Sequence, residues 1–175
     1  DGGNTFTTVY HNPAQSLVGY DANGNGQGNY NFSMCAAPNN PNVVFVGAHV
    51  VWRSTDGGVT WTQLTQWWQI LHTDMHQMLY NPYSTQELYN INDGGIWRSL
   101  NAGLNWGVRC NGLEATEIYK AASNPVRKDN LSIGTQDNGE LFSANGQWRT
   151  NRGGDWSSRM TYDYKNYNMD YYHEN

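Results

Sequence analysis

The chain has 175 residues, a formal net charge of −5 and only ten lysines and arginines. Because nucleic acids are bound mainly through basic side chains, this balance argues against a nucleic-acid partner. No run of about eighteen apolar residues occurs, so we expect no membrane-spanning segment. Aromatic residues reach 14% and glycine occurs 19 times, which favours an all-β chain of short strands.

One turn sequence recurs along the chain. Residues 54–61, Ser-Thr-Asp-Gly-Gly-Val-Thr-Trp, return at 99–106 as Ser-Leu-Asn-Ala-Gly-Leu-Asn-Trp, and residues 1–6 resemble the tail of an earlier copy. Aspartate followed by two glycines favours a tight turn, because glycine adopts positive φ without steric cost and aspartate accepts hydrogen bonds from turn amides. We call residues 54–61 the Asp-Gly turn and expect it to join two strands.

The spacing of the copies predicts a β-propeller of four-stranded antiparallel blades. Asp56 and Asn101 are 45 residues apart, which is the length of one such blade. We predict a blade remnant at 1–10, blades at 30–65, 74–110 and 116–151, and a partial blade at 158–175. Since propellers close with about four to eight blades, the remaining blades of a parent protein are expected partners.

Strand-forming residues between the turns place the individual strands. The predicted strands are Tyr30–Ala37, Val43–Gly47, His49–Arg53, Val59–Leu64, Met75–Tyr80, Leu88–Ile91, Ile96–Ser99, Asn105–Arg109, Glu117–Ala122, Leu131–Gly134, Glu140–Ser143, Gln147–Thr150, Arg159–Tyr164 and Met169–Tyr172.

A glycine- and asparagine-rich loop precedes the first full blade. Asp21, Asn23 and Asn25, followed by Gly26, resemble the first half of an EF-hand calcium loop. The twelfth position is Phe32 rather than the bidentate glutamate. A calcium site and a plain flexible loop are both open interpretations.

Two tryptophans form a second insertion. Trp67 and Trp68 are adjacent and fall outside the strand pattern. They could form a platform on which a sugar ring stacks, or cap a blade.

The two cysteines are expected to remain free. Cys35 falls on the first strand of one blade and Cys110 on the last strand of the next. Strands at opposite edges of a blade are about 14 Å apart, which is beyond the reach of a disulfide.

A histidine-aspartate cluster precedes the inner strand of the second full blade. If the segment is extended, His72, Asp74 and His76 lie on one face, because strand side chains alternate. Two imidazoles and a carboxylate could bind zinc or another divalent metal. They could equally form a metal-free ligand or catalytic site facing the propeller channel, or a structural hydrogen-bonded cluster.

Further carboxylates sit in glycine-bearing turns. Asp93 and Asp137 follow the second strands of successive blades, and Asp155 lies in a later turn. Asp93 and Asp137 are therefore expected side by side, and with Asp74 they could supply the paired carboxylates of a glycoside hydrolase. The alternative is that each aspartate only caps its turn.

The Asp-Gly turn is similar to the Asp-box, or BNR repeat, of sialidases, sortilin-type domains and xyloglucanase-like hydrolases. An ordered series of motifs resembles large secreted bacterial BNR propellers, many of them exported by the type IX secretion route. That series comprises Asn39, Pro41, Asn42, Val46, Gly47, Trp52–Ser54, His72, Asp74, His76, Asn92–Ile96 and Gly134–Gly139. The resemblance implies a propeller in a secreted or bacterial cell-surface protein. The sialidase arginines and Tyr-Glu pair have no matching positions, so sialidase catalysis is not implied.

Three functions follow as hypotheses. The first is recognition of a glycan or protein, and the second is glycoside hydrolysis by Asp74, Asp93 or Asp137. The third is a purely structural segment of an adhesin or secretion substrate. The candidate ligand-binding residues are His72, Asp74, His76, Asp93, Asp137, Trp67 and Trp68.

Overall fold

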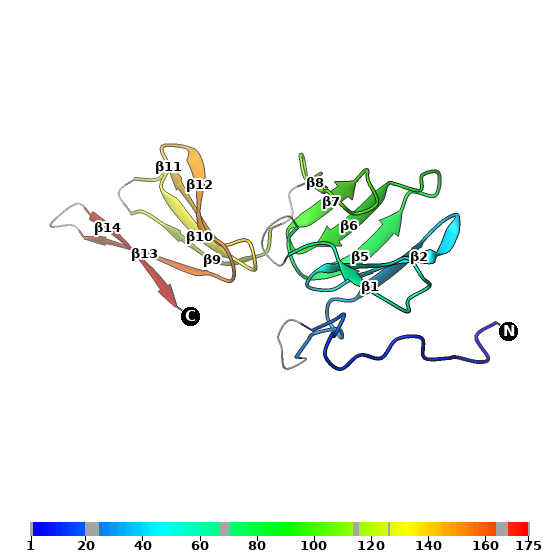
Figure 1. The fold of residues 1–175 in the computed structure, drawn as a ribbon. Coiled ribbons are helices and arrows are strands. Elements are labelled where there is room, and N and C mark those ends of the chain that lie inside the picture. Colours follow the sequence, from blue (N-terminus) through cyan, green and yellow to red (C-terminus); the bar gives the residue numbers. More distant parts are fainter. Residues whose placement is uncertain are drawn as a thin grey trace. The chain divides into compact units, whose positions relative to one another are not determined.

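A computed structural model describes residues 2–19, 25–66, 71–113, 116–125, 127–163 and 168–174. The chain divides into two compact units, residues 1–112 and residues 113–175. The described residues form strands and turns without a helix, which confirms the all-β prediction (Figure 1). None of them belongs to a helix long and apolar enough to cross a membrane.

The first unit contains two four-stranded antiparallel sheets, with strand orders β1-β2-β3-β4 and β5-β6-β7-β8. This meander is the topology of a propeller blade. In each blade the first strand is inner and the fourth is outer, and β1 contacts β5 of the next blade. The strands are β1 (Ser33–Ala37), β2 (Asn40–Gly47), β3 (Val51–Ser54), β4 (Thr62–Gln63), β5 (Met75–Tyr80), β6 (Leu88–Asn92), β7 (Gly95–Ser99) and β8 (Gly107–Val108).

The second unit contains a third sheet of the same kind and a two-stranded hairpin. The sheet has the order β12-β11-β10-β9, and β13 pairs with β14. Its strands are β9 (Ile118–Ser123), β10 (Leu131–Thr135), β11 (Glu140–Ala144), β12 (Gln147–Arg152), β13 (Ser157–Asp163) and β14 (Asn168–Glu174). The chain is therefore a partial β-propeller.

Each predicted strand is present, although the outer strands of the first unit are shorter than predicted. The fourth strand of the first blade covers Thr62–Gln63 rather than Val59–Leu64, and its counterpart covers Gly107–Val108 rather than Asn105–Arg109. The Asp-Gly turn occupies the missing residues, because its backbone amides bind to side chains of the turn instead of to a neighbouring strand.

Alternating residues of β2 build cores on its two faces. Phe45 is fully buried in a cluster with Met75 and Leu88 of the second blade. Its neighbour Val46 points the other way and packs with Trp52. Because successive strand side chains face opposite sides, this single strand joins the two blades through one face and carries a second, smaller cluster on the other.

The Asp-Gly turn is a closed set of hydrogen bonds. Ser54 Oγ accepts the amide of Gly58 at 2.8 Å, and Asp56 Oδ1 accepts the amide of Thr60 at 2.9 Å. Asp56 Oδ2 accepts the Thr60 hydroxyl at 2.6 Å. Trp61 Nε1 donates to the Gly58 carbonyl at 2.9 Å. The turn thus fixes the outer hairpin of the blade, as predicted.

The copy in the second blade makes three of these four bonds, without a charge. Ser99 Oγ accepts the amide of Gly103 at 2.9 Å, and Asn101 Oδ1 accepts the amide of Asn105 at 2.8 Å. Trp106 Nε1 donates to the Gly103 carbonyl at 3.0 Å. One side-chain oxygen at the position of Asp56 is therefore enough to hold the turn amide.

The backbone conformation also recurs in the N-terminal copy. The φ angles are 66° and 85° in Gly2–Gly3, 75° and 94° in Gly57–Gly58, and 53° and 81° in Ala102–Gly103. Residues 2–10 form no strand, so the predicted blade remnant retains its turn alone. Downstream of it, the Tyr10 ring stands edge-on to Trp61 at 6.3 Å.

Both cysteines are free thiols, as predicted. Burial raises the pKa of Cys35 to about 12, so its thiol stays protonated at neutral pH. Cys110 Sγ accepts the amide of Ile96 at 3.1 Å. Each thiol therefore has a packing role in its own blade.

We expect Asp56→Ala to lower the melting temperature of the protein and Asp56→Asn to lower it much less. Alanine removes the acceptor of the Thr60 amide, whereas asparagine keeps it, as Asn101 does in the second blade. Thermal unfolding followed by tryptophan fluorescence and circular dichroism measures the difference. Asn101→Ala is the matched variant and should resemble Asp56→Ala. Equal melting temperatures for the two Asp56 variants would contradict this account of the turn.

The same carboxylate should contribute to acid unfolding. The hydroxyl of Thr60, together with turn amides and Ser54, lowers the pKa of Asp56 from 3.8 to about 2. Since the folded pKa is depressed, its stabilisation is present above pH 3.8 and is lost as the pH falls towards 2. Unfolding titrations should show a smaller loss of stability over that interval in Asp56→Asn than in the wild type. Parallel stability curves would contradict the prediction.

Candidate functional site

Asp74 lies directly before β5, after a bend at Thr73, and is buried, with 8% of its surface exposed. Its φ angle is 57°, in the left-handed region. Residues 72–76 are therefore not extended throughout, so the condition for a common strand face is not met and His72, Asp74 and His76 do not line one. A left-handed residue before the strand breaks the two-residue alternation on which that prediction depended.

The Asp74 carboxylate is hydrogen-bonded to two side chains and lies beside a third, all from earlier parts of the first unit. Oδ1 accepts from Gln27 Nε2 at 2.5 Å and from Asn31 Nδ2. His49 Nδ1 lies 3.4 Å from the same oxygen. A buried carboxylate needs such donors, because an unpaired charge would be costly in the interior. The network ties the loop before β1 to the start of β5.

Asp93 forms a second, more accessible part of the site with His76 and Tyr30. Asp93 lies in the turn between β6 and β7, and its Oδ1 is 2.5 Å from His76 Nε2. Its Oδ2 accepts the Tyr30 hydroxyl at 3.2 Å. A carboxylate only accepts hydrogen bonds, so His76 carries a proton on Nε2. The Tyr30 and His76 rings stand edge to face with centroids 5.0 Å apart.

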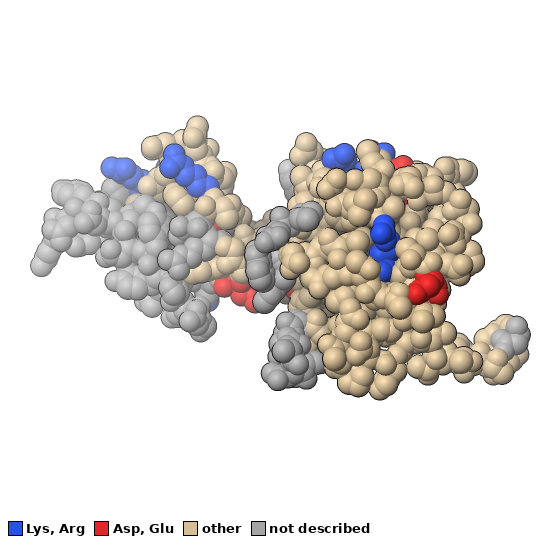
Figure 2. Space-filling model, viewed as in Figure 1, with Lys and Arg blue, Asp and Glu red and all other residues tan. Residues whose placement is uncertain are grey.

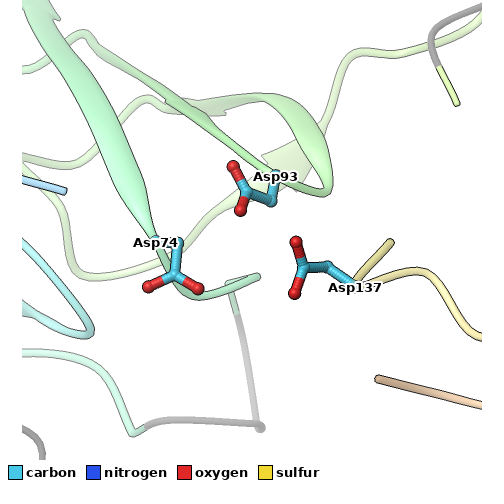
Figure 3. A group of neighbouring side chains, drawn as sticks. All are labelled: Asp74, Asp93 and Asp137. Carbon is cyan, nitrogen blue, oxygen red and sulfur yellow. The ribbon is translucent and has the colours of Figure 1, made fainter. Parts of the chain in front are cut away.

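The carboxylates of Asp74 and Asp93 lie near each other in the first unit (Figure 3). Each offers an oxygen within 4.8 Å of the other. Two carboxylates at this distance could share a divalent cation. The histidines are not part of this pair: His76 binds Asp93, and His72 Nδ1 lies 3.2 Å from the Thr73 carbonyl.

His72 instead fixes the turn that carries Asp93. A Cβ added to Gly94 would lie 2.5 Å from the Cβ of His72. A Cβ added to Gly95, whose φ is 113°, would meet Cys110 Sγ. The two glycines after Asp93 are therefore required by close contacts on both sides, and the turn holds the carboxylate rigidly.

Asp137 belongs to the second unit, where it follows β10 and is also drawn in Figure 3. Its φ is 57°, and its amide donates to Asp155 Oδ1 at 3.0 Å. Burial and the nearby charges of Asp155, Asp137 and Glu117 raise the pKa of Tyr119. Acidic side chains of the second unit thus act electrostatically on this tyrosine.

Burial dominates the electrostatics of His49. Desolvation lowers its pKa from 6.5, although the charge of Asp74 acts in the opposite direction. The Thr73 hydroxyl donates to the His49 carbonyl at 3.3 Å, so His49 Nδ1, at 2.7 Å from Thr73 Oγ1, is the donor in that contact. His49 is therefore a neutral positioning residue behind Asp74.

Part of the sequence-based site lies outside the described residues. This applies to Asp21, Asn23, Trp67 and Trp68. Asn25 is described, but the calcium loop as a whole and the tryptophan platform stay predictions.

Sequence reasoning missed the residues that hold the carboxylates. Gln27 lies at the end of the glycine-rich loop, and Tyr30, Asn31 and His49 fall within predicted strands, where no ligand role is expected of them. The one available signal was a cluster of amide and aromatic side chains directly after a loop that cannot pack by itself.

Similar solved structures are β-propeller proteins. A GH74 enzyme from Niastella koreensis is 18% identical, with a TM-score of 0.40, and the match covers 78% of this chain and 24% of that one. The GH74 xyloglucanase from Xanthomonas campestris is 15% identical, with a TM-score of 0.38 and coverages of 77% and 25%. YCF48 from Cyanidioschyzon merolae is 17% identical, with a TM-score of 0.37 and coverages of 76% and 47%.

The chain thus spans from about a quarter to about half of the length of these proteins. No protein-family model and no curated protein matches it significantly. The assignment of a propeller fold therefore rests on the strand order within this chain's own sheets.

The stability of the protein should fall as the pH is lowered from 7.5 towards 5, in part because of His49. Its folded pKa lies below the unfolded value of 6.5, so the unfolded chain binds more protons in this range and protonation favours unfolding. Urea unfolding at several pH values measures the slope. His49→Gln should flatten it, whereas His11→Gln, an exposed histidine, should not. An unchanged slope in His49→Gln would contradict the assignment.

Proposed function

We propose that this partial propeller recognises a glycan, through the accessible face formed by Tyr30, His76 and Asp93. The observation that carries the proposal is the edge-to-face pair of Tyr30 and His76 with Asp93 hydrogen-bonded to both. Tyr30 is 50% exposed, so part of its ring is open to a ligand. A carboxylate that accepts sugar hydroxyls beside an exposed aromatic ring is a suitable arrangement for a saccharide.

The inner carboxylate supports this face from behind. Asp74 is buried and its Oδ1 is occupied by Gln27 and Asn31. These bonds fix the loop that carries Tyr30, because Asn31 is its neighbour in sequence. Asp74 therefore acts as a positioning residue, and Asp93 is the carboxylate that a ligand would touch.

Glycoside hydrolysis is less well supported by this pair. Retaining enzymes separate their two carboxyl groups by about 5–5.5 Å and inverting enzymes by about 6.5–9.5 Å. Asp74 and Asp93 have oxygens within 4.8 Å, and Asp74 is buried. An acid–base pair needs access to a bond in the substrate, which the buried member lacks.

The proposal extends to the parent protein. The recurring Asp-Gly turn supports membership of the Asp-box propellers, and with it a secreted or bacterial cell-surface location and export by the type IX route. We expect the parent protein to contain further blades that pack against this chain. A protein ligand is the alternative to a glycan at the same face. Figure 2 shows few charged side chains on the face in view of residues 1–112, which suits neutral or weakly charged ligands.

Binding to a glycan array, followed by titration of the best ligand, tests the recognition site. We expect Tyr30→Ala and Asp93→Asn each to weaken binding by about tenfold or more, since one lost charge-assisted or aromatic contact is worth about 1.4 kcal/mol. Tyr83→Ala is the matched control, because Tyr83 is 97% exposed and lies apart from the site. No bound glycan, or equal loss in the control, would contradict the proposal.

A chelator distinguishes this site from a metal-dependent one. We expect glycan binding to be unchanged by EDTA, because protein donors already occupy Asp74 and Asp93. The same titration with and without EDTA, followed by added calcium or zinc, is the measurement. Loss of binding in EDTA that either metal restores would instead support a cation held by the two carboxylates.

A further inference from the structure

A separate pocket lies at the outer edge of the second blade. It has a volume of about 290 Å³ and is lined by Arg98 of β7, by Trp106, Gly107 and Arg109, and by Leu100 and two asparagines of the preceding turn. Its volume lies just below the range of about 300–1,000 Å³ that is usual for small-molecule sites, so it has room for one small ligand at most. Tyr30, His76 and Asp93 are not among the residues that line it.

Two arginines give the pocket its charge. Arg98 Nε donates to Glu87 Oε1 at 2.6 Å, and its guanidinium lies 6.0 Å from the centre of the Tyr89 ring. Glu87 also accepts the Tyr89 hydroxyl at 2.7 Å. These contacts fix the Nε edge of the guanidinium, while 31% of the Arg98 side chain remains exposed. Arg109 adds a second, exposed guanidinium.

Gly107 opens the space between the two arginines. It pairs directly with Arg98 across the ladder between β7 and β8. Arg109 folds back so that its Nη1 donates to the Val108 carbonyl at 2.8 Å. A Cβ added to Gly107 would lie 3.4 Å from that same Nη1. A larger side chain at 107 would therefore project between the guanidinium groups.

The corresponding position in the first blade carries different side chains. There Thr62 pairs with Arg53, as Gly107 pairs with Arg98. Leu64 stands at the place of Arg109, and Asp56 at the place of Asn101. Three differences thus act together in the second blade: a side chain that would fill the space is missing, a cation is added and an anion is removed.

We propose that this pocket binds the carboxylate of a hexuronic-acid sugar. A guanidinium and a carboxylate form paired, charge-assisted hydrogen bonds. Trp106 lines the pocket with an aromatic surface, and Asn101 and Asn105 line it with amides, which suit the ring and hydroxyl groups of a sugar. The volume admits a single sugar residue, so a terminal or side-branch uronate is the ligand class.

Titration of the protein with D-galacturonic acid, followed by two-dimensional NMR, tests the proposal. We expect shifts of the Gly107 amide and the Trp106 indole, and binding about tenfold tighter than that of methyl galactoside, which lacks the carboxylate. Binding should weaken as salt is raised. Shifts confined to other residues, or equal binding of the neutral sugar, would overturn it.

Variants that restore the first-blade residues provide the sharper test. Gly107→Thr and Arg109→Leu should each reduce uronate binding by about tenfold or more. Thr62→Gly makes the reverse change in the first blade and should leave uronate binding unchanged. Arg109 is exposed, so its variant is expected to fold, and circular dichroism checks this. Unchanged binding in Arg109→Leu would refute the site.

Two further ligands test which chemical group the pocket recognises. Acetate and inorganic phosphate should bind at least about tenfold more weakly than the uronate, because they do not reach Trp106. Equal affinities would show a simple anion site and overturn the sugar assignment, as would tighter binding of a short glutamate peptide. Tyr30→Ala should not change uronate binding, because Tyr30 does not line this pocket. The uronate pocket and the proposed glycan site can therefore be disproved independently of each other.

Discussion

The hydrogen-bond set of the Asp-Gly turn is the constraint on which the outer half of each blade in the first unit depends. The outer strands, Thr62–Gln63 and Gly107–Val108, are too short to be held by ladder bonds alone. Serine and aspartate or asparagine oxygens capture the turn amides, and the indole closes the loop onto a glycine carbonyl. This fixes the register of the last strand pair, because a one-residue slip would break every one of these bonds.

The inner half of the same blades depends on a different interaction, the burial of Asp74. Its left-handed backbone turns the carboxylate towards Gln27 and Asn31, away from the strand face that an extended chain would give. The long loop before β1 is thereby fastened to the first strand of the next blade. Tyr30 is then held beside His76, so the arrangement of these two rings depends on a buried carboxylate.

The blade pattern was predictable from sequence, since Met75–Tyr80 and its counterparts follow from alternation and the turn spacing alone. Asp74 and Asp93 also stand out in the sequence as candidates, because carboxylates beside glycines and histidines are uncommon in a plain strand pattern. The positions of their carboxylates were not predictable. One positive φ angle at Asp74 redirects the side chains of residues 72–76, and no local rule indicates it for a non-glycine residue. The partners in the loop are distant in sequence and gave no periodic signal.

The indole contacts of the turns give the molecule a set of internal reporters. Trp61, Trp106 and Trp156 each donate Nε1 to the carbonyl three residues earlier, at 2.9, 3.0 and 2.7 Å. An indole proton held in this way exchanges with solvent only when its own turn opens. Hydrogen exchange at these indole protons would therefore report separately on the turns of the first two blades and on the segment between β12 and β13. The order in which the repeats come apart could be followed in the unlabelled natural sequence, without an added probe.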